Sequence, residues 1–151
     1  MKSSADQQSW CFGHSSPPPI FETDRFLVVA LTGVYAWNLL AVLLQDEALA
    51  SRVDWMKDKS RDGALQEAFC IELQRNAGQA RVWSIVDRAR RMQVGAVIVR
   101  HSIEGLDVDV LVASPFWDQG VSDEAVAPVM EWLERTNLTL QFVVKLNHTL
   151  P

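Results

Sequence analysis

A short polar loop joins an apolar, strand-like run to a helix-like run in the second half of this chain. The strand-like run spans residues 106–113, the loop spans residues 117–122 (WDQGVS), and the helix-like run begins near Ser122. The first backbone N–H groups of a helix have no intrahelical acceptor, and the helix dipole adds partial positive charge there. The sequence therefore predicts a strand, a turn and a helix, with a site for phosphate oxygens at the start of the helix.

The size and charge of the chain limit the classes of protein to which it can belong. Its 151 residues, 48% hydrophobic and 22% charged, are enough for one domain with a buried core. Residues 1–19, rich in Ser, Gln and Pro, are expected to form a flexible leader, and residues 20–151 a single domain. The net charge of −5 argues against broad nucleic-acid binding. The only basic run, residues 88–91, falls in an expected hairpin turn.

The cysteines give no sign of a disulfide scaffold. Cys11 lies in the leader and Cys70 on an expected helix, so a reducing, cytoplasmic location fits the sequence. Cys11 and His14 have the spacing of metal ligands, but no second pair completes a zinc site. We therefore expect no bound metal.

Residues 26–44 contain no charged side chain and leave two structures open. About 20 apolar residues can span a bilayer, so the segment could be a membrane anchor. Thr32, Gly33 and Asn38 interrupt it, however, and a buried strand followed by a helix explains it equally well. Membrane attachment is the less favoured alternative. Residues 1–19 also lack the apolar core of a signal peptide.

The hydrophobic periodicity along the chain predicts the order β-α-α-β-β-β-α-β. The expected strands cover residues 25–31, 81–86, 93–99, 106–113 and 138–146. The expected helices cover residues 34–50, 62–76 and 122–135. This order predicts an α/β protein of the α+β type, in which helices flank a mixed, largely antiparallel sheet.

Three sequence motifs resemble one family in the same order along the chain. They are residues 21–27 (FETDRFL), residues 82–85 (VWSI) followed by 93–95 (QVG), and residues 116–125 (FWDQGVSDEA). Together they resemble the GNAT superfamily of N-acetyltransferases, most closely the branch that acetylates the N-termini of ribosomal proteins. The resemblance extends over residues 20–147. It implies a GNAT-like fold, acetyl-CoA as the co-substrate, and an amine acceptor, either a protein N-terminus or a small molecule.

The resemblance also implies which residues contact acetyl-CoA. Backbone amides at the start of the last helix would hold the pyrophosphate without a metal. These amides belong to Gln119, Gly120, Val121 and Ser122. Leu111 and Val112 would contact the pantetheine arm, and Asn147 would lie near it. The alternative is an ordinary turn in which Ser122 caps the helix and Gly120 makes the bend.

Acetyl transfer also requires a group that removes a proton from the amine. Strand alternation places Asp107, Asp109 and Leu111 on one face of the strand at 106–113. Asp107 occupies the position where the resembling branch often has a glutamate, so it is the first candidate for the base, and His101 is the second. A polar strand face turned to water is the alternative interpretation of the two aspartates.

The sequence also departs from the family pattern. Asp118 replaces the first glycine of the loop, and Pro128 lies inside the last expected helix. GNAT domains continue with another helix and two strands, so the resemblance implies a domain that is incomplete at its C-terminus. The chain could then be a catalytically impaired relative that acts as a scaffold or association module. The strand at 138–146 would be an exposed sheet edge, which predicts a homodimer or a marginally stable monomer.

Overall fold

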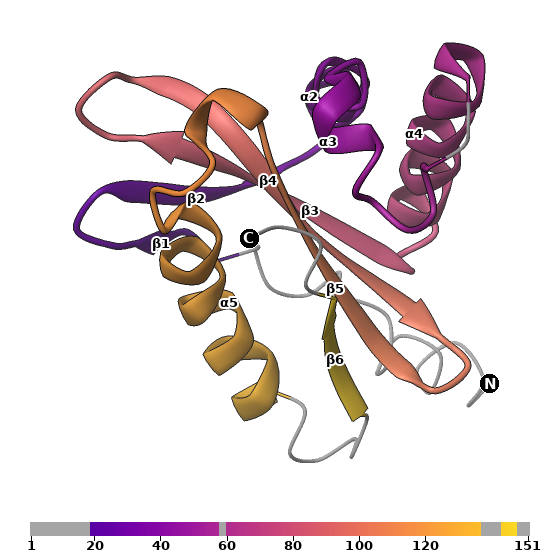
Figure 1. The fold of residues 1–151 in the computed structure, drawn as a ribbon. Coiled ribbons are helices and arrows are strands. Elements are labelled where there is room, and N and C mark those ends of the chain that lie inside the picture. The colour runs from indigo at the N-terminus through magenta and orange to yellow at the C-terminus, as the bar shows by residue number, and fades with distance from the viewer. Residues whose placement is uncertain (1–18, 58–59, 137–142, 148–151) are drawn as a thin grey trace, which may run out of the picture.

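The computed structural model describes residues 19–57, 60–136 and 143–147. These residues form a six-stranded sheet in the order β1-β2-β3-β4-β5-β6, in which only β5 and β6 run parallel (Figure 1). The strands are β1 (Phe21–Glu22), β2 (Phe26–Leu31), β3 (Ala80–Asp87), β4 (Met92–Ser102), β5 (Gly105–Val112) and β6 (Val143–Asn147). The helices are α2 (Val34–Leu43), α3 (Glu47–Ala50), α4 (Arg61–Asn76) and α5 (Val121–Thr136), with a 3₁₀ turn at Ser114–Phe116. The predicted α/β class and the largely antiparallel sheet are confirmed.

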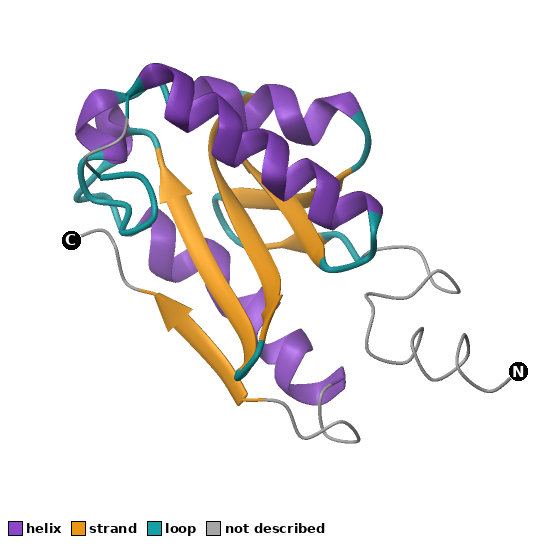
Figure 2. Cartoon of the chain, turned by 90° about the vertical axis from the view of Figure 1, so that its right-hand side faces the viewer, coloured by secondary structure: helices purple, strands orange, loops and turns teal. Residues whose placement is uncertain are grey.

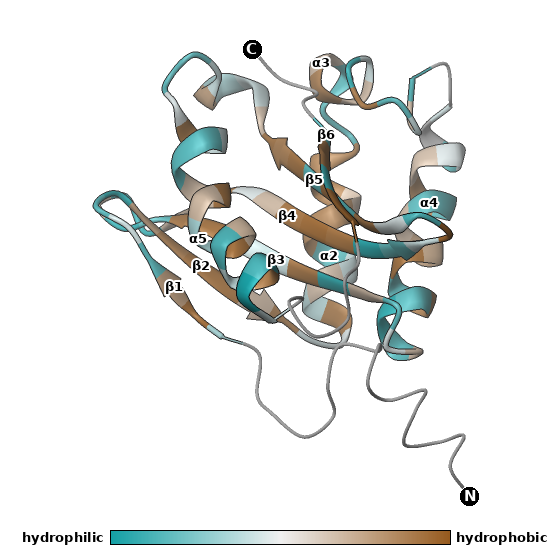
Figure 3. Ribbon diagram, turned by 90° about the horizontal axis from the view of Figure 1, so that it is seen from below, coloured by the Kyte–Doolittle hydropathy of each residue, from teal (hydrophilic) through white to brown (hydrophobic). Residues whose placement is uncertain are grey.

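Helices cover both faces of the sheet. Helices α2, α3 and α4 lie on one face, and α5 lies on the other (Figures 1 and 2). In Figure 3 the strands are largely brown, and teal, hydrophilic segments lie on the helices, in the turns and at the ends of strands. This arrangement requires two cores, one for each face of the sheet.

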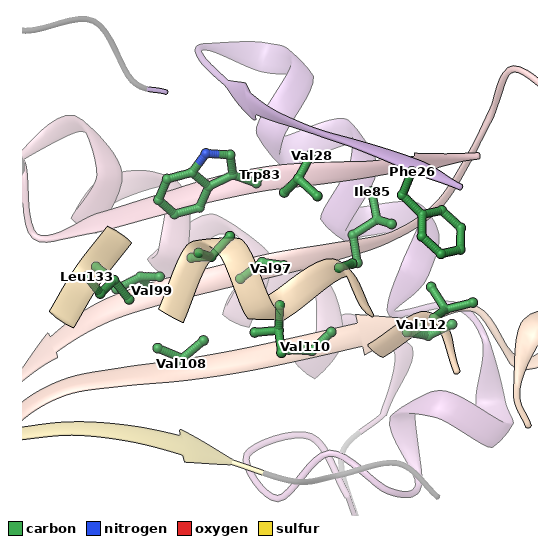
Figure 4. Packing of buried hydrophobic residues seen from close by; sticks show 14 of the residues in the cluster. Phe26, Val28, Trp83, Ile85, Val97, Val99, Val108, Val110, Val112 and Leu133 are labelled. Carbon is green, nitrogen blue, oxygen red and sulfur yellow. The ribbon is translucent and has the colours of Figure 1, made fainter. Parts of the chain in front are cut away.

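The two cores divide the strand residues by their alternation. The core under α5 contains Trp83, Val97, Val99, Val108 and Val110 (Figure 4). The core under α2 and α4 contains Val82, Ala96, Ile98 and Leu111 from the same strands. Because successive strand side chains point to opposite faces, the strands in the middle of the sheet are apolar on both sides.

The segment at 26–44, which has no charged residue, forms a strand and a helix rather than one continuous helix. Its first part is β2, which pairs with β1 and β3, and its second part is α2. Among the described residues, no helix combines the length and apolar character needed to cross a membrane.

One predicted helix is divided in two. The prediction of a single helix over residues 34–50 is wrong, because the chain breaks between α2 and α3. Asp46 causes the break: its carboxylate accepts a hydrogen bond from the Leu49 amide at 3.2 Å and caps α3. The second carboxylate oxygen accepts a hydrogen bond from the Ser114 amide at 2.7 Å. Asp46 therefore ties α3 to the segment that follows β5.

The two ends of the predicted domain are only partly described. Residues 1–18 of the expected leader and residues 137–142 of the last expected strand lie outside the described residues. The described part of that strand, β6, pairs with β5 from Gly105↔Val143 to Asp109↔Asn147. These five pairs place β6 at the edge of the described sheet.

Candidate functional site

The loop at residues 117–120, named the phosphate loop after the phosphate site that the sequence predicts there, connects β5 to α5 through a backbone of unusual conformation. Asp118 has φ 64° and Gly120 has φ 71°, both in the left-handed region. Glycine adopts this region without steric cost, and aspartate tolerates it better than most residues. The Trp117 indole Nε1 donates to the Val112 carbonyl at 2.7 Å. This hydrogen bond folds the loop back over the end of β5.

The amides at the start of α5 are open. No described residue accepts a hydrogen bond from the backbone amides of residues 119–123, and the first amide with an acceptor is Glu124, which donates to Gly120 O at 3.2 Å. Ser122 lies inside the helix, one residue after its start at Val121, and makes no capping bond with a described residue. The capped-turn interpretation of Ser122 is therefore wrong. Gln119 and Gly120 are exposed, Ser122 is half-buried, and Val121 anchors the helix start in the core.

A guanidinium group lies directly against the phosphate loop. A side chain at Gly120 would place its Cβ 3.6 Å from Nη2 of Arg25. Arg25 Nε donates to Glu124 Oε1 at 2.7 Å, and Glu124 Oε2 accepts from Thr23 Oγ1 at 2.6 Å and from the Arg25 amide at 3.0 Å. Partial burial works to raise the pKa of Glu124, but these hydrogen bonds and the positive charge of Arg25 outweigh it and lower that pKa. Glu124 is thus a carboxylate that holds Arg25 beside Gly120.

This contact explains why two distant motifs occur together. Thr23 and Arg25 belong to the motif at 21–27, and Glu124 belongs to the motif at 116–125. The sequence showed both motifs but not their contact, because the residues are 99 or more positions apart. The only signal of this contact in the sequence was that one motif contains a cation, Arg25, and the other a carboxylate, Glu124.

Two further arginines stack on the aromatic residues at the loop. The Cζ atom of Arg52 lies 5.0 Å from the ring centroid of Trp117, and that of Arg90 lies 5.8 Å from the centroid of Phe116. Neither forms an ion pair with a described residue. Asp118 is exposed. The loop therefore lies among three guanidinium groups. They belong to Arg25 just before β2, Arg52 in the connector after α3, and Arg90 in the β3–β4 turn.

The end of β5 offers backbone groups on the side away from β4. The Ala113 amide donates to Val94 O at 2.9 Å, and the register continues as Val112↔Gly95 and Leu111↔Ala96. Antiparallel pairs alternate between bonded and non-bonded positions, so Leu111 directs its backbone groups toward β4 and Val112 directs its own away. Pairing with β6 ends at Asp109 among the described residues. Val112 is consequently the better placed of the two predicted contacts, through its amide, because its carbonyl already accepts from Trp117 Nε1.

The two candidate bases lie on opposite faces of the sheet. Asp107 is half-buried and shares a face with Leu111, on the side of α2 and α4, where it is paired in register with Arg100 and Lys145. His101 is paired with Leu106, which belongs to the core under α5. Burial lowers the pKa of the His101 imidazole. The structure brings Asp107, but not His101, to the face shared with Asp109.

Asp109 is a buried carboxylate whose role the sequence did not reveal. It is 2% exposed and accepts hydrogen bonds from Trp55 Nε1 at 3.2 Å, Arg100 Nη2 at 3.4 Å and Asn147 Nδ2 at 3.0 Å. Arg100 also lies 5.0 Å from the centroid of the Trp55 ring. The interpretation of Asp109 as part of a water-facing strand surface is wrong, because partners from three segments enclose it. Asn147, predicted to lie near the pantetheine arm, is held at the end of the β5–β6 pairing.

No metal centre is found in the described part of the chain. Residues 19–57, 60–136 and 143–147 contain no group of three or more His, Cys, Asp or Glu side chains that could hold a metal ion. Cys11 and His14 lie outside these residues.

Comparison with known proteins identifies the fold and the family. The family model described as Acetyltransferase (GNAT) domain matches residues 25–148. No curated protein matches the sequence. Among solved structures, the chain is similar to RimL, a ribosomal L7/L12 alpha-N-protein acetyltransferase in complex with coenzyme A, with TM-score 0.57 and 15% identity over 78% of this chain and 68% of that one.

Two further structures show the same fold. A putative ribosomal-protein-serine acetyltransferase from Vibrio cholerae has TM-score 0.54 and 22% identity, over 82% of this chain and 71% of that one. A putative GNAT-family acetyltransferase from Bordetella pertussis has TM-score 0.55 and 14% identity, over 78% and 72%. At these identities the structural likeness establishes the fold, while the family model establishes the family.

Proposed function

We propose that this chain, which belongs to the GNAT acetyltransferase family, transfers an acetyl group from acetyl-CoA to an amine. The acceptor would be a protein N-terminus or a small-molecule amine. The observation that supports this most strongly is the row of open amides at residues 119–122, beside the guanidinium of Arg25. Several structural neighbours carry names of ribosomal-protein acetyltransferases, and one was solved with coenzyme A. These names favour a peptide N-terminus as acceptor.

The loop provides what pyrophosphate binding requires. Open amides at a helix start, aligned with its dipole, donate hydrogen bonds to phosphate oxygens without a metal. The backbone at Gly120 is approachable because the residue has no side chain and is exposed. Arg25 adds a positive charge that Glu124 holds in place. We assign the pyrophosphate to the amides of Gln119, Gly120, Val121 and Ser122.

The pantetheine arm would follow β5 from the loop as far as Asp109, where pairing with β6 begins, and direct its thioester toward Asp107. Val112 directs its amide away from β4, while its carbonyl is bonded to Trp117, and Leu111 beside it contributes its side chain to the core under α2 and α4. Val112 and Asp107 are five positions apart, which corresponds to roughly 17 Å along a strand. A long extended arm can span this separation, with its pyrophosphate at the loop and its thioester near Asp107. Asn147 would lie beside the arm, where β6 ends its pairing.

Asp107 would act as the base on the face shared with α2 and α4. When bound, acetyl-CoA supplies an activated acyl group as a thioester. The Asp107 carboxylate takes a proton from the acceptor ammonium group, and the amine lone pair then forms the new C–N bond. The C–S bond would break, and the leaving thiolate would take up the second proton that the attacking nitrogen loses as it becomes an amide. His101, on the opposite face, is the less favoured base.

One feature favours a second function. Asp118 places a negative charge in the phosphate loop, where it opposes an anionic ligand. A chain that retains the fold but does not bind acetyl-CoA would act as a scaffold or association module. We favour catalysis because the amides beside Asp118 remain open.

We also propose a cytoplasmic location, since Cys70 is a free, exposed thiol.

Calorimetric titration with acetyl-CoA separates these functions. The unaltered chain should bind acetyl-CoA, Gly120→Asp should abolish binding, and Asp107→Asn should keep binding while losing transfer to an N-terminal serine or alanine peptide. Gly120→Asp introduces a negative charge at the centre of the amide cradle. If the unaltered, folded chain binds no acetyl-CoA, the proposed catalytic function is wrong and the association function is favoured.

A further inference from the structure

An open pocket of about 580 Å³ adjoins the phosphate loop on the side of the hairpin turns. Its lining comes from the β1–β2 turn, the β3–β4 turn and the loop itself. The lining residues are Asp24, Arg25, Asp87, Arg88, Ala89, Arg90 and Gln119. In Figure 1 the two hairpin turns lie at the same end of the sheet as the start of α5. Gln119 belongs both to this pocket and to the row of open amides.

Two of the three pocket arginines already have carboxylate partners. Arg25 is paired with Glu124 at 2.7 Å, and Arg88 with Glu22 at 2.7 Å. Arg88 Nη1 also donates to Thr23 O at 2.8 Å. These contacts fix both guanidinium groups at the pocket wall. Both terminal nitrogens of Arg88 are engaged, and the Glu22 carboxylate largely neutralises its positive charge.

Arg90 is different from the other two. It forms no ion pair with any residue in the described ranges, and its guanidinium stacks 5.8 Å from the centroid of the Phe116 ring. The nearby Asp87 carboxylate is used by the turn, since its Oδ1 accepts from the amides of Ala89 and Arg90 at 3.0 Å each. A ring contact orients an arginine without neutralising it. Arg90 therefore presents an available positive charge to the pocket.

We propose that Arg90, assisted by Arg25, binds the 3′-phosphate on the ribose of coenzyme A. This inference rests on the proposed function and names a subsite of the same ligand. In coenzyme A the ribose joins the pyrophosphate to this third phosphate. A ligand whose pyrophosphate lies on residues 119–122 therefore has its ribose next to the pocket that Gln119 shares. Guanidinium groups match phosphate geometry in paired hydrogen bonds, which makes an arginine pocket selective for this group.

Asp24 supplies the opposing charge in the same pocket. Its carboxylate forms no hydrogen bond or ion pair with a residue in the described part of the chain, and it lines the pocket with Arg90. A like charge near a bound phosphate weakens binding. Asp24→Asn should therefore strengthen binding of coenzyme A and leave the form without the 3′-phosphate unaffected.

The test compares coenzyme A with 3′-dephospho-coenzyme A by calorimetry. The unaltered chain should bind coenzyme A about tenfold more tightly, the effect of roughly one charge-assisted hydrogen bond. Arg90→Gln should bring this ratio close to one by weakening only coenzyme A. Arg91→Gln is the matched control, because it removes the same charge from the same turn but does not line the pocket. It should leave the ratio unchanged.

Each outcome decides a separate claim. Equal binding of the two ligands by the unaltered chain would overturn the subsite while leaving the proposed function intact. A fall in the ratio as large in Arg91→Gln as in Arg90→Gln would also overturn it, since the effect would then be general charge attraction. Binding of neither ligand would overturn both the subsite and the proposed function. Circular dichroism of each variant establishes that it is folded.

Discussion

The Asn147 carboxamide nitrogen lies 3.0 Å from a carboxylate oxygen of Asp109, at the last described pair of β5 and β6. The other oxygen of Asp109 accepts from Trp55 and Arg100. One buried carboxylate thus connects β4, β5, β6 and the connector after α3 at the point where the described pairing of β5 and β6 ends. Beyond this point lies the segment of β5 to which we assign the pantetheine arm.

Replacing Asp109 should cost much more stability than replacing its neighbour Asp107. Asp109→Ala leaves Trp55, Arg100 and Asn147 without their acceptor, which should lower the free energy of unfolding by about 2–4 kcal/mol. Asp107 is half-buried and no hydrogen bond to its side chain is seen among the described residues, so Asp107→Ala should cost less than about 1 kcal/mol. Urea denaturation measures both. Equal losses would contradict the role of Asp109 as a structural hub.

Glu124 and Asp46 should make the protein less stable in acid. Hydrogen bonds lower the pKa of both carboxylates in the folded state, against the opposing effect of burial. A lowered folded pKa contributes stability above the unfolded value, near 4.5 for Glu124 and 3.8 for Asp46, and this stability is lost as pH falls through the folded values.

The measurement is the midpoint of urea unfolding between pH 6 and about pH 3. Glu124→Gln should be less stable than the unaltered chain at pH 6, and its stability should fall less on acidification. Asp46→Asn provides a second variant, because its contacts to Leu49 and Ser114 lie away from the loop. Parallel pH curves for Glu124→Gln and the unaltered chain would show that the Arg25–Glu124 contact has no part in acid stability.

Two glycines of the family-like motifs should respond differently to alanine. A Cβ at Gly95 would lie on the Leu111 carbonyl oxygen of the neighbouring strand, so Gly95→Ala should cost about 2–3 kcal/mol and disturb β5. A Cβ at Gly120 has room, with Arg25 Nη2 at 3.6 Å, so the cost there comes from the backbone at φ 71° and should be about 1 kcal/mol. Thermal unfolding compares them. A larger loss for Gly120→Ala would contradict the described packing.

The edge strand β6 should mediate self-association. In the described sheet β6 has a neighbour only on its β5 side, and Val143 on it is 66% exposed. Unpaired edges with apolar residues favour pairing with a second chain. We expect sedimentation velocity to show a dimer at high concentration and Val143→Lys to shift it toward monomer. A folded monomer at every concentration would contradict the prediction.

The sequence predicted the elements well because local patterns determine them. Alternation placed Asp107, Asp109 and Leu111 on one face of β5, and the helix expected over residues 62–76 corresponds to α4, which Ser60 caps by accepting from the Gly63 amide at 3.2 Å. The break at Asp46 was missed because a short polar run, Gln45 to Glu47, between apolar residues also fits the solvent-facing side of a continuous helix. The carboxylate caps α3 through the Leu49 amide and also accepts from the Ser114 amide, 68 residues away, a contact that no local pattern predicts.

The site was predicted less completely because its contacts join distant segments. The loop at 117–122 was recognisable from local sequence, whereas Arg25 and Glu124 are 99 residues apart and Trp55 and Asp109 are 54 apart. Nor could alternation alone reveal that Asp109 would be enclosed while Asp107 stays accessible. That difference depends on Trp55, Arg100 and Asn147, which come from three separate segments.

Amide chemical shifts test the central claim most directly, namely that the start of α5 binds the pyrophosphate of acetyl-CoA. In a ¹H–¹⁵N correlation spectrum, titration with coenzyme A should move the signals of Gln119, Gly120, Val121 and Ser122 most strongly, with a smaller change at Val112. Shifts confined to other parts of the chain, with these four signals unmoved, would contradict the account.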